Sequence, residues 1–440
     1  MRQDGDRARG TLMFGLENAQ SLLGIVAIVG LCWALSEQRR VFPWRLALGV
    51  VVAQAALILI LFALPASRVV LDGATAVVNA LAASTQAGVK FVFGFLSGLP
   101  DSQPYAVSNP QGLFVFAFRV LPVIIVVCAL SALLWHWRIL QWVTRGFGLV
   151  FERTMGLGGA PALAVAATMF MGQVEGPIFI RGYLKSLSRA DLFMLITVGM
   201  TCVAGSTVVA YVTILSGSVP NAAAHVLTAS VISAPAGVLL ARIMVPREPG
   251  EEADRSIDLR GARDYSGSID ALMRGTSDGL QIALNVGAIL IVLVALITIA
   301  NGLLGMAPRV GGAPLSVQGI LGWFFSPLAF LMGIPWREAP AAGALLGDKL
   351  VLTEFTAFAD LSSGVHGAIG GRARVIMTYA LCGFANIGSV GINVAGYSIL
   401  VPERREEVVS LVWKAMLAGF LATCMTASVV GAMPGGFLAE

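Results

Sequence analysis

Charged side chains are scarce in this sequence. Asp, Glu, Lys and Arg make up 12% of its 440 residues, against about 25% in an ordinary soluble domain. Hydrophobic residues make up 57%. This composition excludes a soluble globular domain and predicts a polytopic membrane protein.

Cysteine and histidine are also rare. The five cysteines all lie in apolar segments without paired spacing, so we expect free thiols. The three histidines, His136, His225 and His366, show no metal-ligand spacing, and we assign them no site. The net charge is +4, and the basic residues are spread over the loops instead of forming one patch. It therefore does not indicate a nucleic-acid partner.

Common enzyme motifs are absent. The sequence has no Walker A motif, no G-x-S-x-G elbow and no H-E-x-x-H, so ATPase and hydrolase chemistry lack a scaffold. We expect the protein not to be an enzyme and to need no cofactor. An intramembrane hydrolase that uses two carboxylates stays open as a rival, and so does a channel.

Long apolar windows dominate what is present. A helix needs about 20 apolar residues to cross a bilayer, and windows of this kind predict an all-α protein with about eight transmembrane helices. They lie near 19–36, 45–64, 114–135, 192–215, 226–245, 280–300, 375–400 and 407–431. Aromatic residues interleaved with arginines over 137–151 predict an amphipathic helix at the membrane interface.

Two further apolar segments, 160–181 and 339–359, carry glycine, proline or charge at their middle. We predict that they form re-entrant helical hairpins. Each precedes a span interrupted by small and polar residues, "GMTCVAGS" at 199–206 and "GFANIGS" at 383–389. When the loops rich in lysine and arginine are placed inside, the hairpins enter from opposite sides. Such an inverted repeat places a site near the midplane in many secondary transporters.

Each predicted hairpin carries a carboxylate. Glu175 stands in "MGQVEGP" and Glu354 in "LTEF". An ionisable residue at membrane depth is costly enough to indicate function, so we expect both residues where the two repeats meet. Asp348 and Lys349 come shortly before Glu354. The sequence leaves open whether their charges serve the site or neutralise each other.

Four motifs in consistent order closely resemble the concentrative nucleoside transporter family. They are "GQVE…P" at 172–177, "GMTCVAGS" at 199–206, "LLGDKLVLTEFTAF" at 345–358 and "YALCGFANIGS" at 379–389. The similarity runs from about Gly159 to Gly431. It implies a homotrimer in the bacterial inner membrane, each protomer with eight spans and two re-entrant hairpins. It also implies nucleoside uptake driven by a sodium or proton gradient.

The resemblance further implies roles for single residues. The nucleobase would be bound by Gln173 and Glu175, with Val174 and Thr207 beside them. The ribose hydroxyls would be bound by Glu354, Asn386 and Ser389, with Phe384 against the sugar or the base. Carboxylates and amides supply the acceptors and donors that such a solute needs.

Val174, Thr353 and Cys202 depart from the family pattern. Val174 replaces the usual Thr or Ser and removes one hydrogen bond to the base. The candidate sodium site would consist of Thr168, Met171, Cys202 and Val203. Hard cations prefer oxygen ligands, and the Cys202 thiol is a poor substitute for a hydroxyl. We therefore favour a proton over sodium as the coupling ion, carried by Glu175 or Glu354.

The expected organisation has six parts: an N-terminal three-span region (1–136), an interfacial amphipathic helix (137–158), a first transport repeat (159–216), scaffold spans with an inner loop and an interfacial helix (217–335), a second transport repeat (336–400), and the last span with the C-terminus (401–440). The expected function is cation-coupled nucleoside symport by alternating access. Symport of free nucleobases or of another small polar solute is the alternative within transport.

Overall fold

The computed structural model describes residues 15–63, 65–99, 102–104, 106, 113–248, 265–309 and 314–434. All regular secondary structure in these ranges is helical. This confirms the predicted all-α fold class.

Seven helices in the described ranges are long and apolar enough to cross a membrane. They are α2 (Leu16–Ala34), α3 (Trp44–Ala63), α4 (Pro65–Phe93) with η2 (Gly94–Ser97), α5 (Phe116–Arg119) with α6 (Leu121–His136), α12 (Ala222–Met244), α13 (Ser268–Leu304), and η6 (Pro402–Arg404) with α19 (Arg405–Gly431). All except α4 coincide with windows predicted from the sequence.

Helix α4 was not predicted from the sequence, and it adds a long helix to a region where three spans were expected. Its most apolar window has a mean hydropathy of 1.2, against 2.3 for α3. Asp72, Lys90 and several small polar residues lower that average. The helix therefore falls near the limit at which hydropathy alone identifies a span.

Two of the predicted spans are interrupted helices, as their small and polar residues indicated. The first consists of α10 (Arg189–Thr201) and α11 (Gly205–Leu215), and the second of α17 (Gly371–Leu381) and α18 (Ile387–Leu400). Residues 202–204 and 382–386 form the breaks. A helix end leaves backbone groups without intrahelical partners, so each break exposes polar groups inside an apolar segment.

A pair of short helices precedes each interrupted helix, at the positions where hairpins were predicted. The pairs are α8 (Gly159–Met171) with α9 (Glu175–Ile178), and α15 (Ala339–Val351) with α16 (Glu354–Ser363). In the first pair, Gly172 has a φ of 121°, which favours glycine. A Cβ there would also stand 2.7 Å from Oε2 of Glu175. The short η5 (Arg181–Tyr183) follows α9.

Two further helices flank these pairs, α7 (Ile139–Met155) before the first and α14 (Val317–Leu331) before the second. In α7, Phe151 is 6% exposed and Trp142 is 79% exposed. This two-sided character matches the amphipathic helix predicted for this segment.

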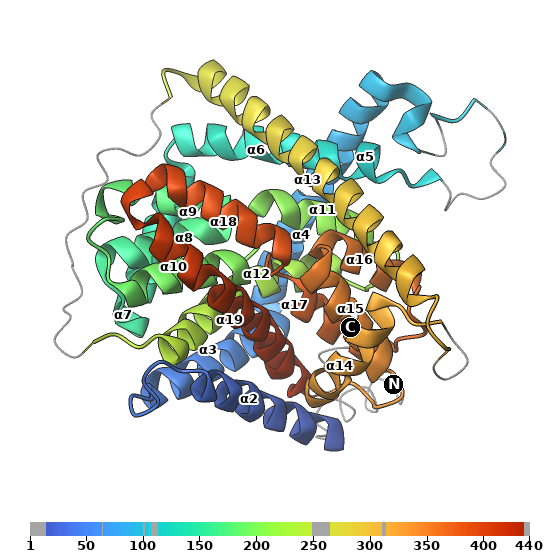
Figure 1. Cartoon of the computed structure of the whole chain (residues 1–440). Coiled ribbons are helices and arrows are strands. Elements are labelled where there is room, and N and C mark those ends of the chain that lie inside the picture. Colours follow the sequence, from blue (N-terminus) through green and yellow to red (C-terminus); the bar gives the residue numbers. More distant parts are fainter. Residues whose placement is uncertain are drawn as a thin grey trace, which may run out of the picture.

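Small residues allow α13 to cross close to α6. A Cβ on Gly275 would lie 2.8 Å from Cα of Ala129, and one on Gly279 would lie 2.8 Å from Cα of Ile125. Figure 1 shows α13 running across the molecule beside α6. Close backbone approach at small residues is a common way for helices to pack in membranes.

Helices α12 and α19 form the centre of the molecule. In their most apolar windows 83% and 67% of residues are buried, against 6% for α13. Figure 1 shows α8, α9 and α10 on one side of this centre, and α14, α15 and α16 on the other. The two helical pairs and the breaks of the interrupted helices are thus arranged around one buried core.

Candidate functional site

The breaks of the two interrupted helices lie against each other. A Cβ on Gly383 would stand 2.6 Å from the carbonyl oxygen of Thr201 and 3.3 Å from that of Met200. These two residues end α10. Glycine at position 383 therefore lets the second break approach the first, and it brings polar groups of both repeats together.

Glu354 links the second helical pair to both interrupted helices. It is the first residue of α16 and is 3% exposed. The Tyr211 hydroxyl on α11 donates to its Oε1 at 2.9 Å, and Nδ2 of Asn386 donates to its Oε2 at 2.8 Å. These two donors and the positive end of the α16 dipole stabilise the buried carboxylate.

Gln173 makes the corresponding contacts from the first helical pair. Its Nε2 donates to Oγ of Ser389 at 3.3 Å, and its Oε1 accepts from Nδ2 of Asn393 at 2.9 Å. Oδ1 of Asn386 accepts from the backbone N–H of Ser389 at 2.8 Å. The contacts of Gln173 and those of Glu354 therefore form one continuous network.

We call this network the polar layer: Gln173, Tyr211, Glu354, Asn386, Ser389 and Asn393. All of its members are buried. One acceptor, Oδ1 of Asn393, is buried and meets no donor in the part of the chain that the structure describes. An unsatisfied buried acceptor costs about 1–3 kcal/mol, and a donor on a bound solute would remove that cost.

Three other predicted residues have neighbours of their own. Thr207 is 5% exposed, and its hydroxyl donates to the carbonyl of Ala204 at 2.7 Å. Val174 packs on α18, where a Cβ on Gly396 would stand 2.5 Å from the Val174 Cγ1. Phe384 is half-buried in the second break. Val174 thus contacts the same helix as Gln173, and its contact is apolar.

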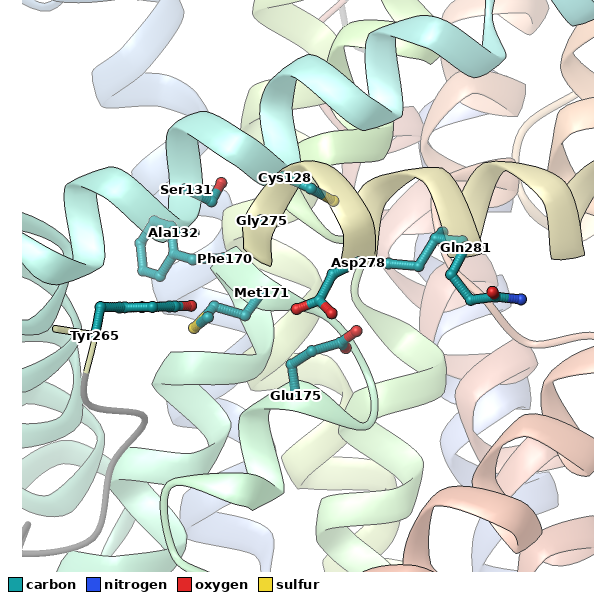
Figure 2. A pocket seen from close by; sticks show the side chains of 11 residues that line it. Cys128, Ser131, Ala132, Phe170, Met171, Glu175, Tyr265, Gly275, Asp278 and Gln281 are labelled. Atoms are coloured by element: carbon teal, nitrogen blue, oxygen red, sulfur yellow. The ribbon is translucent and has the colours of Figure 1, made fainter. Parts of the chain in front are cut away.

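Glu175 lies in a different environment from Glu354. It begins α9, is half-buried, and lines a cavity of about 220 Å³ together with residues of α6, α8 and α13. Figure 2 shows the carboxylates of Glu175 and Asp278 pointing toward one another, with Met171 nearby. The two predicted carboxylates therefore lie in separate surroundings. Glu354 belongs to the polar layer, and Glu175 faces the cavity beside α13.

The residues of the candidate sodium site lie on α8 and in the first break. Thr168 is 2% exposed, and its hydroxyl donates to a carbonyl of the preceding turn at 2.7 Å. Cys202 and Val203 are buried, and the Ser230 hydroxyl lies 3.5 Å from the Val203 carbonyl. Met171 ends α8 and lines the cavity. Side chains of this set offer one hydroxyl and two sulfur atoms.

Asp348 and Lys349, whose roles the sequence left open, have different partners. The buried ammonium of Lys349 donates to the carbonyl of Ala380 and the hydroxyl of Thr423, both at 2.7 Å. Asp348 instead pairs with His366. Adjacent helical residues do not face each other, so neither charge neutralises its neighbour by direct contact.

Two members of the polar layer, Tyr211 and Asn393, were not predicted from the sequence. Each lies four residues after a predicted residue, namely Thr207 and Ser389. Residues at this spacing share one face of a helix. The four-residue spacing could therefore have indicated that Tyr211 and Asn393 lie beside the predicted residues.

Interrupted helices whose breaks meet between two similar halves are typical of secondary transporters. Comparisons with known families agree. Three family descriptions match consecutive parts of the chain: "Na+ dependent nucleoside transporter N-terminus" over residues 23–96, "Nucleoside recognition" over 117–218, and "Na+ dependent nucleoside transporter C-terminus" over 225–431.

Whole-length relatives give the same result. The uncharacterized transporter YutK of Bacillus subtilis is 37% identical over 412 residues, which cover 93% of this chain and 98% of that protein. The nucleoside permease NupC of Helicobacter pylori is 33% identical over 424 residues, covering 94% and 97%. The solved structure of CNTnw in an inward-facing substrate-bound state matches with a TM-score of 0.86 at 34% identity, covering 95% of this chain and 98% of that one. The chain belongs to the concentrative nucleoside transporter family.

Proposed function

We propose that this protein is a cation-coupled symporter that carries nucleosides into the cell by alternating access. The polar layer is the observation that carries the proposal. It holds a carboxylate, three amides and two hydroxyls between two repeats, away from water. A ribose ring presents adjacent hydroxyl groups, and a carboxylate flanked by amides can accept from and donate to them.

The proposed roles are those that the resemblance to the family implies. Glu354, Asn386 and Ser389 would hydrogen-bond the ribose, and Phe384 would pack against the sugar or base. Gln173 and Glu175 would bind the nucleobase, with Val174 and Thr207 beside it. Glu175 points into the cavity beside α13, and we propose that the first helical pair moves relative to α13 when the base binds. In alternating access, one part of the transporter moves against the rest in this way around the binding site.

We propose a proton as the coupling ion, in preference to sodium. Thr168 would contribute the single side-chain oxygen of the sodium set, and Cys202 contributes sulfur, which a hard cation disfavours. A buried carboxylate can hold a proton. Glu354 and Glu175 are the proposed carriers.

We propose that the protein works as a homotrimer in a bacterial inner membrane, in which the repeats 159–216 and 336–400 move against the remaining helices. The surface of α13 is apolar and exposed: the Ile291 side chain is 74% exposed and that of Leu303 is 66% exposed. This supports a hydrophobic environment around the helix. Lipid and neighbouring protomers are the surroundings that such side chains require.

The test is uptake of radiolabelled uridine into proteoliposomes, with proton and sodium gradients imposed separately. We expect accumulation under an inward proton gradient without sodium. Excess unlabelled uridine should compete, whereas uracil, which lacks the ribose, should not. Strict dependence on sodium would overturn the proton assignment. Equal competition by uracil would favour a nucleobase symporter, and recovery of cleaved product would favour a hydrolase.

A further inference from the structure

Three side chains with metal-binding atoms gather around the second helical pair. Asp348 lies on α15, Asp360 on α16 and His366 on the link from α16 to α17. Their ligand atoms all lie within 4.8 Å of one another. Nε2 of His366 is 2.5 Å from Oδ2 of Asp348 and 3.8 Å from Oδ2 of Asp360. The sequence indicated no site at His366, because the three histidines show no metal-ligand spacing.

The link that carries His366 has a defined shape. Gly364 and Gly367 have φ angles of 70° and 122°, which glycine tolerates without strain. The N–H of Gly367 donates to the carbonyl of Gly364 at 3.0 Å, and the N–H of Gly370 donates to Oε2 of Glu338 at 2.9 Å. The backbone that carries His366 is therefore fixed on both sides of this residue, as a preorganised support for a ligand would be.

The charge of the cluster favours a cation. Asp348 is 2% exposed, so its carboxylate depends on a partner within the protein. Lys349 does not supply this partner, because its ammonium is bonded to Ala380 and Thr423. In this cluster the imidazole of His366 faces both carboxylates, and a divalent cation would balance their two negative charges.

We propose that Asp348, Asp360 and His366 bind a divalent transition-metal ion, with Zn²⁺ as the best fit. Zinc takes imidazole nitrogen and carboxylate oxygen at about 2.0–2.2 Å, and tetrahedral geometry then separates the ligand atoms by about 3.3 Å. The distances of 2.5 and 3.8 Å lie on either side of this value, so small side-chain rotations suffice. The imidazole distinguishes this set from an ordinary acidic cluster, because imidazole nitrogen is a good ligand for zinc and a poor one for calcium or magnesium.

A bound ion would join three parts of the second repeat. It would fasten α15 to α16 and both to the link that leads into α17. Glu354 begins α16, and Asn386 follows α17. Zinc would therefore restrain the residues of the polar layer relative to one another and slow uptake. The binding itself goes beyond the proposed function, since it does not depend on which solute is carried.

The first test is equilibrium dialysis of the purified full-length protein, without a histidine tag, against radioactive Zn²⁺. We expect one saturable site per chain. The variants Asp360→Asn and His366→Gln should each weaken it by about tenfold or more. His136→Gln removes a histidine outside the cluster and should leave binding unchanged. An absence of saturable binding in the parent protein, or equal affinity in all four proteins, would overturn the proposal.

The second test needs no variant. Co²⁺ in place of Zn²⁺ should give visible bands of a nitrogen- and oxygen-bound ion, without the near-ultraviolet charge-transfer band of a cobalt–thiolate. A thiolate band would assign the metal to cysteines and overturn the proposal. Uridine binding measured on the same samples separates a failure of the metal site from a failure of the proposed transport function.

Discussion

Nδ2 of Asn386 lies 2.8 Å from Oε2 of Glu354. Asn386 is also the N-cap of α18, where its Oδ1 accepts from the N–H of Ser389. One side chain therefore connects the start of α18 with the start of α16. Any solute that competes for the Glu354 carboxylate also acts on the helix end that Asn386 holds.

Glu354→Gln should lower uridine uptake by about 10- to 100-fold, because the hydrogen bonds of a charged acceptor are worth about 1.5–3 kcal/mol. The change keeps the shape of the side chain and removes its charge. Initial rates in proteoliposomes would measure it. Glu406→Gln, at an exposed position of α19, is the matched control. Uptake near that of the parent protein would remove Glu354 from the site.

Tyr211→Phe should raise the KM for uridine by about 5- to 10-fold, since one hydrogen bond to Glu354 is lost. Tyr379→Phe is the control, because Tyr379 is equally buried but pairs with His225. If both variants change KM alike, the effect is one of general packing. The assignment of Tyr211 to the polar layer would then be wrong.

Gly396→Ala should destabilise the protein by about 1–3 kcal/mol. The new Cβ would stand 2.5 Å from Cγ1 of Val174, and so force α9 and α18 apart. The double variant Gly396→Ala/Val174→Ala should recover most of the loss, because the two sites are in contact. Thermal unfolding in detergent measures both effects. Additive losses would show that the contact is not the cause.

Cys202→Ser should increase the response of uptake to sodium, because it replaces a thiol with a hydroxyl in the candidate sodium site. Cys424→Ser makes the same chemical change at a buried position of α19 and should have no such effect. Rates are compared with sodium and potassium at equal ionic strength. An unchanged ratio in Cys202→Ser would count against this set as an ion site.

His366 should make stability depend on pH. Its pKa is raised in the folded protein by the hydrogen bond to Asp348, above an unfolded value of about 6.5. The protonated form therefore adds stability that is complete below about pH 6.5, and this stability disappears as the pH rises through the folded-state pKa. With metal chelated, the Tm advantage of the parent over His366→Gln should shrink on going from about pH 6 to about pH 9. A constant difference would contradict this pairing.

Much of this fold was predictable because its signals are local. Glycine, proline, charged and small polar residues inside apolar segments indicated both helical pairs and both breaks, and hydropathy indicated six long helices. It missed α4, whose polar residues dilute the average. The contacts between distant segments were not predictable in this way. The bond from Asn393 to Gln173 joins residues 220 positions apart, and the partners of Asp348 and Lys349 depend on packing around α15.

The close pairing of side chains in the polar layer has a consequence for the unloaded protein. Gln173, Ser389 and Asn386 already satisfy one another, and Glu354 has two donors. Binding is therefore an exchange of partners, and its free energy is a difference between two similar sets of bonds. The same internal set would let an empty carrier reorient without exposing a bare carboxylate to lipid, which is what a return step after solute release requires.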